Sequence, residues 1–222
     1  MTHAHNTFQC LHTLTRCGTA ALLLATAVAC ASPTAGGTSA PAKSVLDTPR
    51  PGDTTPVSLE MFHWITWRPW HGTRLPTSDR WGPATVHGDA ATGFSHTPEG
   101  AVMAMMQHQA RLAGTSDTDW PAAARAMAVV APADQPPTHR IATGFDTGSP
   151  LPYFAGFRWL SFTADRAEAD LALQTNDGTL YSLHVIEIWA DADWKAELPA
   201  SGGNLEPLNG MDEYQPWPGT PR

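Results

Sequence analysis

The spacing of apolar residues changes along the second half of the chain, and this change limits the folds that the sequence can form. From residue 97 to 131, apolar side chains recur every three or four positions, as on one face of a helix. From residue 157 to 198 they alternate with polar ones, as in strands that expose one face to solvent. Two helices followed by three to five antiparallel strands predict an α+β fold, in which both helices pack on one face of a curved, cone-like sheet.

The two predicted helices have recognisable ends. The first begins at Thr97-Pro98-Glu99, where a capping threonine, a proline and an acid suit a helix N-terminus, and it ends at Gly114. The second begins at Asp119-Trp120-Pro121 and continues to Pro132. The apolar stripe expected on the first helix consists of Ala101, Val102, Met105, Met106, Gln109 and Leu112.

The strands are predicted at 157–162, 167–174, 179–190 and 194–198. Asn176-Asp177-Gly178 is typical of a hairpin turn, and Asp191-Ala192-Asp193 marks a second turn. Within 179–190, a period of two places His184 and Glu187 on opposite faces of the sheet. A regular strand therefore cannot direct both side chains into one cavity.

Residues 58–96 combine large aromatic side chains with prolines and glycines, and residues 132–155 form a proline-rich connection. We expect the first segment to be irregular and to wrap the core, because each buried indole removes a large apolar area from water. The alternative is that its tryptophans are exposed and bind cell-wall glycan or a protein. The aromatic residues concerned are Phe62, Trp64, Trp67, Trp70 and Trp81.

The N-terminus has the features of an export signal. All 21 acidic residues lie after Cys30, and Arg16 is the only basic residue before it. The apolar run from Ala20 to Ala29 is long enough for a signal peptide but too short to span a bilayer. Residues 1–29 are therefore predicted to be a signal peptide, and the segment Ala27-Val28-Ala29-Cys30 resembles the bacterial lipobox.

Cysteine use favours a lipoprotein. Cys10 and Cys17 would leave with the signal peptide, so Cys30 would be the only cysteine of the mature chain and no intramolecular disulfide is possible. We expect Cys30 to carry the lipid, such as palmitate, that anchors the chain to the outer face of the cell membrane. The alternative is ordinary secretion with Cys30 as a free thiol.

The mature chain divides into two predicted regions. Residues 30–57 are rich in Ser, Thr, Ala, Gly and Pro and are expected to be a disordered tether, whereas 58–222 form a single globular domain. The mature chain keeps 12 of the 13 basic residues and all 21 acidic ones, for a formal net charge of −9. That charge disfavours nucleic acid as a partner, because phosphates require basic surfaces. The expected partners are therefore the membrane, through the lipid anchor at Cys30, and a protein.

Two stretches of the sequence resemble a known family. The first runs from Leu75-Pro76-Thr77-Ser78 through Gly82-Pro83 to Gly93-Phe94-Ser95-His96-Thr97-Pro98-Glu99-Gly100-Ala101. The second is Trp189-Ala190-Asp191-Ala192-Asp193-Trp194-Lys195, where the family usually has glycine in place of Ala192. Both resemble an uncharacterised actinobacterial family often found with integrative and conjugative elements. The second stretch also looks like the last hairpin of nuclear-transport-factor-two-like cones, which implies that fold but no single function.

No set of residues in the sequence forms a recognised catalytic or metal-binding pattern, so we predict a domain without a catalytic residue, metal or cofactor. His96 precedes the first predicted helix and could face Glu187, although a structural role is favoured. Trp159 and His184 are candidates for lining a pocket inside the cone, together with His96. Trp64, Trp67 and Trp70 are candidates for an interaction surface.

Three hypotheses follow from these patterns. The leading one is a non-enzymatic, lipid-anchored extracytoplasmic interaction domain, accessory to a conjugation or secretion apparatus as the family resemblance implies. The second is a small-ligand-binding domain or pocket enzyme that uses the interior of the cone. The third is a module that binds cell-wall glycan through residues 62–81.

Overall fold

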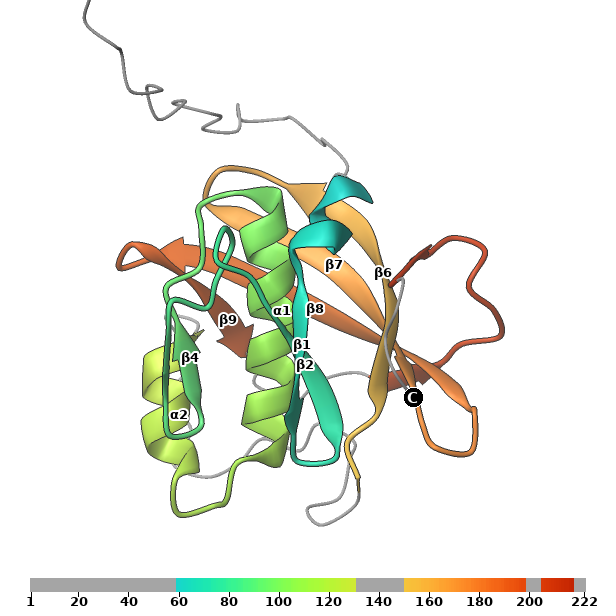
Figure 1. The fold of residues 1–222 in the computed structure, drawn as a ribbon, viewed down its shortest axis with the longest axis horizontal. Helices are drawn as coiled ribbons and strands as arrows, with labels where there is room; N and C mark the ends of the chain where they lie inside the picture. The colour runs from blue at the N-terminus through green and yellow to red at the C-terminus, as the bar shows by residue number, and fades with distance from the viewer. Residues whose placement is uncertain (1–58, 131–149, 199–204, 218–222) are drawn as a thin grey trace, which may run out of the picture. The chain divides into compact units, whose positions relative to one another are not determined.

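The computed structural model describes residues 59–130, 150–198 and 205–217, which belong to one compact unit of the chain. Their elements follow one another in a strand-rich order (Figure 1). In chain order they are η1 (Leu59–Trp64), β1 (Thr66–Trp70), β2 (Thr73–Thr77), β3 (Thr85–His87), β4 (Ala90–Thr92), α1 (Pro98–Gly114), α2 (Trp120–Met127), β5 (Ala128–Val130), β6 (Tyr153–Phe162), β7 (Arg166–Gln174), β8 (Leu180–Ala190), β9 (Asp193–Leu198), β10 (Leu205–Pro207) and β11 (Gln215–Pro216).

The main sheet of the described residues has seven strands in the order β11-β6-β7-β8-β9-β5, with β10 also paired to β8. Its strands are antiparallel except that β5 pairs with β9 in parallel. The predicted fold class, two N-terminal helices on a cone-like antiparallel sheet of three to five strands, is therefore wrong. The added strands β5, β10 and β11 are two or three residues long, too short to show an alternating pattern.

The segment predicted to be irregular precedes the helices and forms two hairpins, β1–β2 and β3–β4. Prolines within and near these strands hide them in the sequence, because proline is depleted in strands. In Figure 1 the hairpin of β1 and β2 runs alongside α1. Its contacts with α1 make it part of the core rather than a loose covering.

Helix α1 is buried on nearly every side, so the predicted single apolar stripe underestimates its burial. It contacts β7, β8 and β9 of the main sheet and also β2 and β4. Gln107 and Arg111, which are not members of the predicted apolar stripe, are both buried. The amide of Gln107 donates to the carbonyl oxygen of Pro76 at 2.7 Å, and the guanidinium of Arg111 donates to the side-chain oxygen of Gln107 at 2.7 Å. The hairpin β1–β2 thus supplies polar partners that allow α1 to be a central helix.

The predicted helix boundaries are confirmed at three of four ends. Thr97 caps α1 by accepting a hydrogen bond from the backbone N–H of Gly100, and the helix ends at Gly114. The second helix begins at Trp120 as expected but ends at Met127. Residues 128–130, predicted to be helical, pair instead with β9 as β5. Their tertiary pairing overrides the helical spacing of the sequence.

The strand pattern of the C-terminal half is confirmed for β7, β8 and β9, which lie within one residue of their predicted ranges, and Gly178 adopts a left-handed φ of 90° in the turn between β7 and β8. The predicted start of β6 is wrong, because this strand begins at Tyr153, within the segment expected to be a connection. Glu187 is completely buried on the α1 side of β8, whereas His184 is exposed on the other face.

The predictions for residues 1–57, including the signal peptide, Cys30 and the tether, lie outside the described residues. Most of the predicted connection 132–155 lies outside them as well. Of the helices in the described part of the chain, neither is long and apolar enough to cross a membrane.

Candidate functional site

A polar groove lies on the face of the main sheet opposite α1. Its volume is about 900 Å³, and residues 206–214 of the C-terminal segment form one wall. Its floor consists of the outward side chains of β6, β7 and β8, because alternation directs every second residue to this face. Those side chains are Arg158, Leu160, Asp170, Ser182 and His184.

An ion-pair chain crosses the floor of the groove. The Arg158 guanidinium donates to the Asp170 carboxylate at 2.6 Å and also pairs with Glu213. The hydrogen bond to Asp170 raises the pKa of Arg158 above its ordinary value. The other oxygen of Asp170 lies 3.0 Å from Nδ1 of His184, and Nε2 of His184 lies 3.2 Å from Glu168. Both nitrogens of this imidazole therefore face carboxylates.

The groove contains a serine, a histidine and an aspartate, but they are not arranged as a nucleophile and its base. The hydroxyl of Ser182 bonds to the Tyr214 hydroxyl at 2.8 Å. The imidazole of His184 lies between the carboxylates of Asp170 and Glu168. Glu168 is opposite Ile186 in the strand pairing, and Ile186 and Ser182 lie on opposite sides of His184 along β8. A catalytic serine requires a histidine nitrogen within hydrogen-bonding reach. This arrangement therefore suits binding of a polar group better than acyl transfer.

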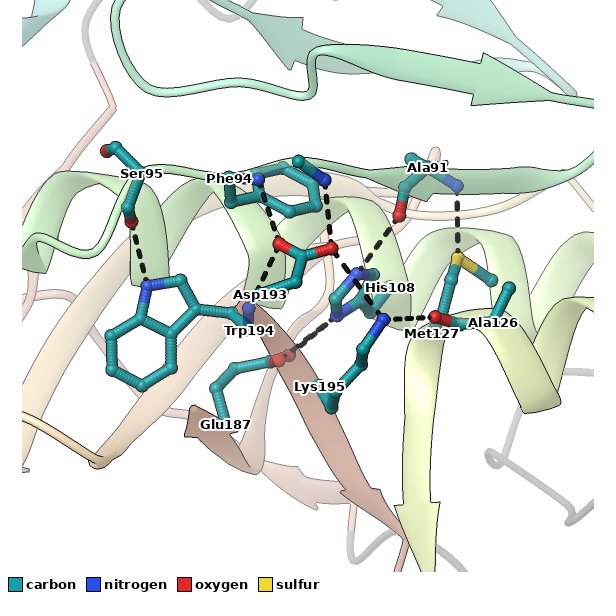
Figure 2. Close-up of polar contacts among 11 residues, drawn as sticks. Ala91, Phe94, Ser95, His108, Ala126, Met127, Glu187, Asp193, Trp194 and Lys195 are labelled. Carbon is teal, nitrogen blue, oxygen red and sulfur yellow. Dashed lines mark hydrogen bonds and ion pairs between the residues drawn. The ribbon is translucent and has the colours of Figure 1, made fainter. Parts of the chain in front are cut away.

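A second polar cluster lies on the α1 side of the sheet and joins the two stretches that carried the family resemblance (Figure 2). The carboxylate of Asp193 accepts hydrogen bonds from the backbone N–H groups of Gly93 at 2.8 Å and Phe94 at 2.9 Å. The indole N–H of Trp194 donates to the carbonyl oxygen of Ser95 at 2.9 Å. The amine of Lys195 donates to the carbonyl oxygen of Ala126 at 2.6 Å. These contacts bind the loop before α1 and the end of α2 to β9.

The same cluster contains a completely buried pair, His108 of α1 and Glu187 of β8. Nε2 of His108 lies 3.3 Å from the carbonyl oxygen of Ala91, which can only accept, so this nitrogen carries a proton. Nδ1 lies 3.1 Å from both carboxylate oxygens of Glu187. A hydrogen bond between these two groups requires one further proton, carried either by Nδ1 or by the carboxyl group. Burial raises the pKa of Glu187, while the attraction of His108 acts in the opposite direction. With no solvent contact, this pair is structural.

The structure separates the candidate pocket residues His96, Trp159 and His184. His96 stacks on Trp189 with ring centroids 3.8 Å apart and bonds to the carbonyl oxygen of Ala164, not to Glu187. Trp159 contacts Phe162 on the core side of β6. His184 alone lines the polar groove, on the other face of the sheet.

The tryptophans at the start of the domain do not form a continuous exposed row. Trp67 packs edge-on against Trp217, and Trp70 is half-buried with its ring beneath the guanidinium of Arg111. Trp64 is 52% exposed, and Arg80 lies over its ring at 4.1 Å.

Sequence reasoning missed most residues of both clusters. Arg158 and Asp170 lie at polar positions of predicted strands, but nothing in their spacing indicates the ion pair that joins them. Tyr214 and Glu213 carry no local pattern, and the chain brings them to β6 and β8 only through the pairing of β10 and β11. His108 was not among the candidate residues, because no local pattern links it to Glu187, 79 positions later in the chain.

In the described ranges, no group of three or more histidine, cysteine and acidic side chains is placed to hold a metal ion. The observed contacts of the groove are hydrogen bonds and ion pairs between its own side chains.

Fold and site together define a mixed-sheet domain built around a buried helix, with a polar groove on the opposite face of the sheet. Residues 26–216 match the family model described as a domain of unknown function, DUF8175. The chain belongs to this family, and the match includes both motif stretches. No match was found among the curated proteins. No solved structure matches the chain.

Proposed function

We propose that this protein is a non-enzymatic, lipid-anchored interaction domain that acts at the outer face of the cell membrane. Its partner is a protein that binds in the groove over β6, β7 and β8. The observation that carries the proposal is the groove itself, a concave polar surface. The charged side chains of its floor, Arg158, Asp170 and His184, form ion pairs with one another and are not directed at one reacting position. Anchoring through Cys30 would place this surface outside the cell.

Two features of the groove support binding over catalysis. Asp170 is nearly buried and pairs with both Arg158 and His184, so contacts within the protein already orient these side chains of the floor. Preorganised polar groups lower the entropic cost of association. The hydroxyls of Ser182 and Tyr214 satisfy each other, which leaves no activated nucleophile.

Site-specific photo-crosslinking in the host membrane tests the location of the interface. A photoreactive amino acid at Leu160 or Asn209, in the groove, is expected to crosslink one defined protein. The matched control is the same amino acid at Val86, which is also exposed, at 52% against 44% for Leu160, but lies in β3, outside the groove. Equal crosslinking from Val86 and from the groove positions would contradict the proposal.

An activity screen tests the absence of catalysis. The purified chain is expected to leave panels of esters, glycans and peptides unchanged. Turnover that disappears in His184→Ala but persists in His63→Ala, an exposed histidine of η1, would show that the groove is an active site.

A role beside a conjugation or secretion apparatus is a further part of the proposal, supported only by the sequence resemblance. Gene neighbourhood tests it directly. A gene for a coupling ATPase or relaxase beside this one supports the role, and a consistent lack of such neighbours among family members counts against it.

Binding of a small ligand is the second candidate, because the groove volume lies within the range of small-molecule sites. Such sites are mainly apolar, whereas this groove is lined largely by charged and hydroxyl groups, which favours a protein partner. A thermal-shift screen of polar metabolites separates the two. A ligand that raises the melting temperature of the wild type but not of Asp170→Asn favours the second candidate.

A further inference from the structure

We infer that the groove binds a positively charged, extended segment of the protein partner. This inference rests on the proposed function and specifies the chemistry of the partner. It is derived from the charges of the groove, from its apolar patches and from its size.

The charges of the groove are strongly unbalanced. Its lining contains four carboxylates and one arginine, Arg158. Arg158 is already paired with Asp170 and Glu213. Glu206 and Asp212 are exposed and form no ion pair with any described residue. Two carboxylates on the wall are thus available to a cation, and a basic partner would complete the pattern of charges.

Apolar groups lie beside these carboxylates. Leu160 is 44% exposed at an irregularity in the pairing of β6 with β7, and Pro207 and Leu208 follow Glu206 in the sequence. Lysine and arginine side chains place their aliphatic stems on apolar surface and keep their charged ends in contact with acids or water. The combination of exposed carboxylates and apolar patches fits such side chains better than it fits a bare inorganic cation.

The size and openness of the groove favour a segment of polypeptide. A volume of about 900 Å³ can accommodate several amino-acid residues and is larger than a single amine group would occupy. The same negative lining repels nucleic acid and anionic lipid headgroups, which leaves a basic protein segment as the occupant.

Fluorescence anisotropy tests this inference on the detergent-solubilised full chain. The probe is a short labelled peptide in which lysine alternates with serine, compared with the same peptide carrying glutamine or glutamate in place of lysine. The lysine peptide is expected to bind and the other two are not. In the double variant Glu206→Gln/Asp212→Asn, affinity should fall about tenfold, since two exposed ion pairs are lost.

The control variant is Asp79→Asn/Asp165→Asn, which removes the same two charges from exposed positions outside the groove. It should change affinity by less than about twofold, because screening weakens distant charges. An equal loss of affinity for the lysine peptide in the two double variants would overturn the inference. Displacement of the labelled peptide by free spermidine, at the same concentration of amine groups, would also overturn it.

Mapping the photo-crosslink from Asn209 separates this inference from the proposed function. A crosslinked partner segment rich in lysine or arginine supports both. A defined partner whose crosslinked segment lacks them overturns the charge inference and leaves the interaction domain in place. Crosslinks that do not depend on the groove overturn the proposed function itself.

Discussion

The carboxylate of Asp193 accepts a hydrogen bond of 2.8 Å from the backbone N–H of Gly93, a hundred residues earlier in the chain. The same side chain accepts from Phe94 and from the N–H of Trp194. One nearly buried acid thus fixes the loop before α1 to the start of β9. This contact joins the two motif stretches of the chain, which are far apart in the sequence.

Replacing Asp193 should destabilise the fold markedly. Asp193→Ala is expected to lower the free energy of unfolding by about 3 kcal/mol, because it leaves buried N–H groups without an acceptor. Asp193→Asn keeps one acceptor oxygen and should lose about half as much. Urea denaturation measures both, and Asp191→Asn, at an exposed position, is the control. A small, equal effect of all three substitutions would show that the contact contributes little.

Ala192 occupies a backbone conformation that glycine prefers. Asp191 and Ala192 have φ angles of 53° and 60°, as in a two-residue turn with both central residues left-handed. Because the side chain of alanine disfavours this region, Ala192→Gly should raise the free energy of unfolding by about 1 kcal/mol. Ala84→Gly, where φ is not positive, should not stabilise the protein. The melting temperatures of the two variants provide the comparison.

The buried pair His108–Glu187 should make stability depend on pH. The pKa of Glu187 is raised in the folded state, so its protonation stabilises the fold at low pH, and this contribution is lost as pH rises through the raised value. Glu187→Gln cannot titrate. The excess stability of the wild type over Glu187→Gln should therefore decrease as pH rises above the ordinary carboxyl value of 4.5.

Chemical denaturation across a pH series measures this difference. The control is Leu160→Ala, which changes an exposed side chain that does not titrate and should therefore show the same pH dependence as the wild type. A difference for Glu187→Gln that stays flat or increases with pH would contradict the assigned direction.

The tryptophans of η1 and β1 should separate into structural and exposed residues. Trp67→Ala is expected to cost about 2 kcal/mol, because the ring packs on Trp217 in the core. Trp64→Ala should cost less than about 1 kcal/mol, since it loses mainly the contact with Arg80. Trp64 is also the residue with which to test glycan binding. A cell-wall pull-down that is unchanged in Trp64→Ala counts against the glycan hypothesis.

Cys30→Ser should prevent lipid attachment. Metabolic labelling with an alkyne fatty acid is expected to label the wild type but not the variant, and the variant should move from the membrane to the soluble fraction. Cys17→Ser should leave labelling unchanged, because that cysteine lies within the predicted signal peptide. An unlabelled wild-type protein would refute the lipoprotein prediction.

Local structure was predictable wherever neighbouring residues determine it. The cap at Thr97, the turn at Gly178 and the faces of β8 follow from residue type and spacing, because capping, turn conformation and alternation act over a few residues. The separation of His184 from Glu187 was predicted for the same reason. His184 was the one groove residue named as a pocket candidate from the sequence, whereas Arg158, Asp170 and Ser182 were visible only as polar positions of predicted strands.

The tertiary structure alone determined the environment of α1 and the composition of the groove. Helix α1 became a central helix because the hairpin β1–β2 gives Gln107 a backbone partner, a contact that spans 31 positions. The groove formed because β10 and β11 return to β8 and β6 and bring Tyr214 and Glu213 beside Ser182 and Arg158. Such contacts depend on chain segments far apart in sequence, and their pairing energy is not encoded in any local pattern.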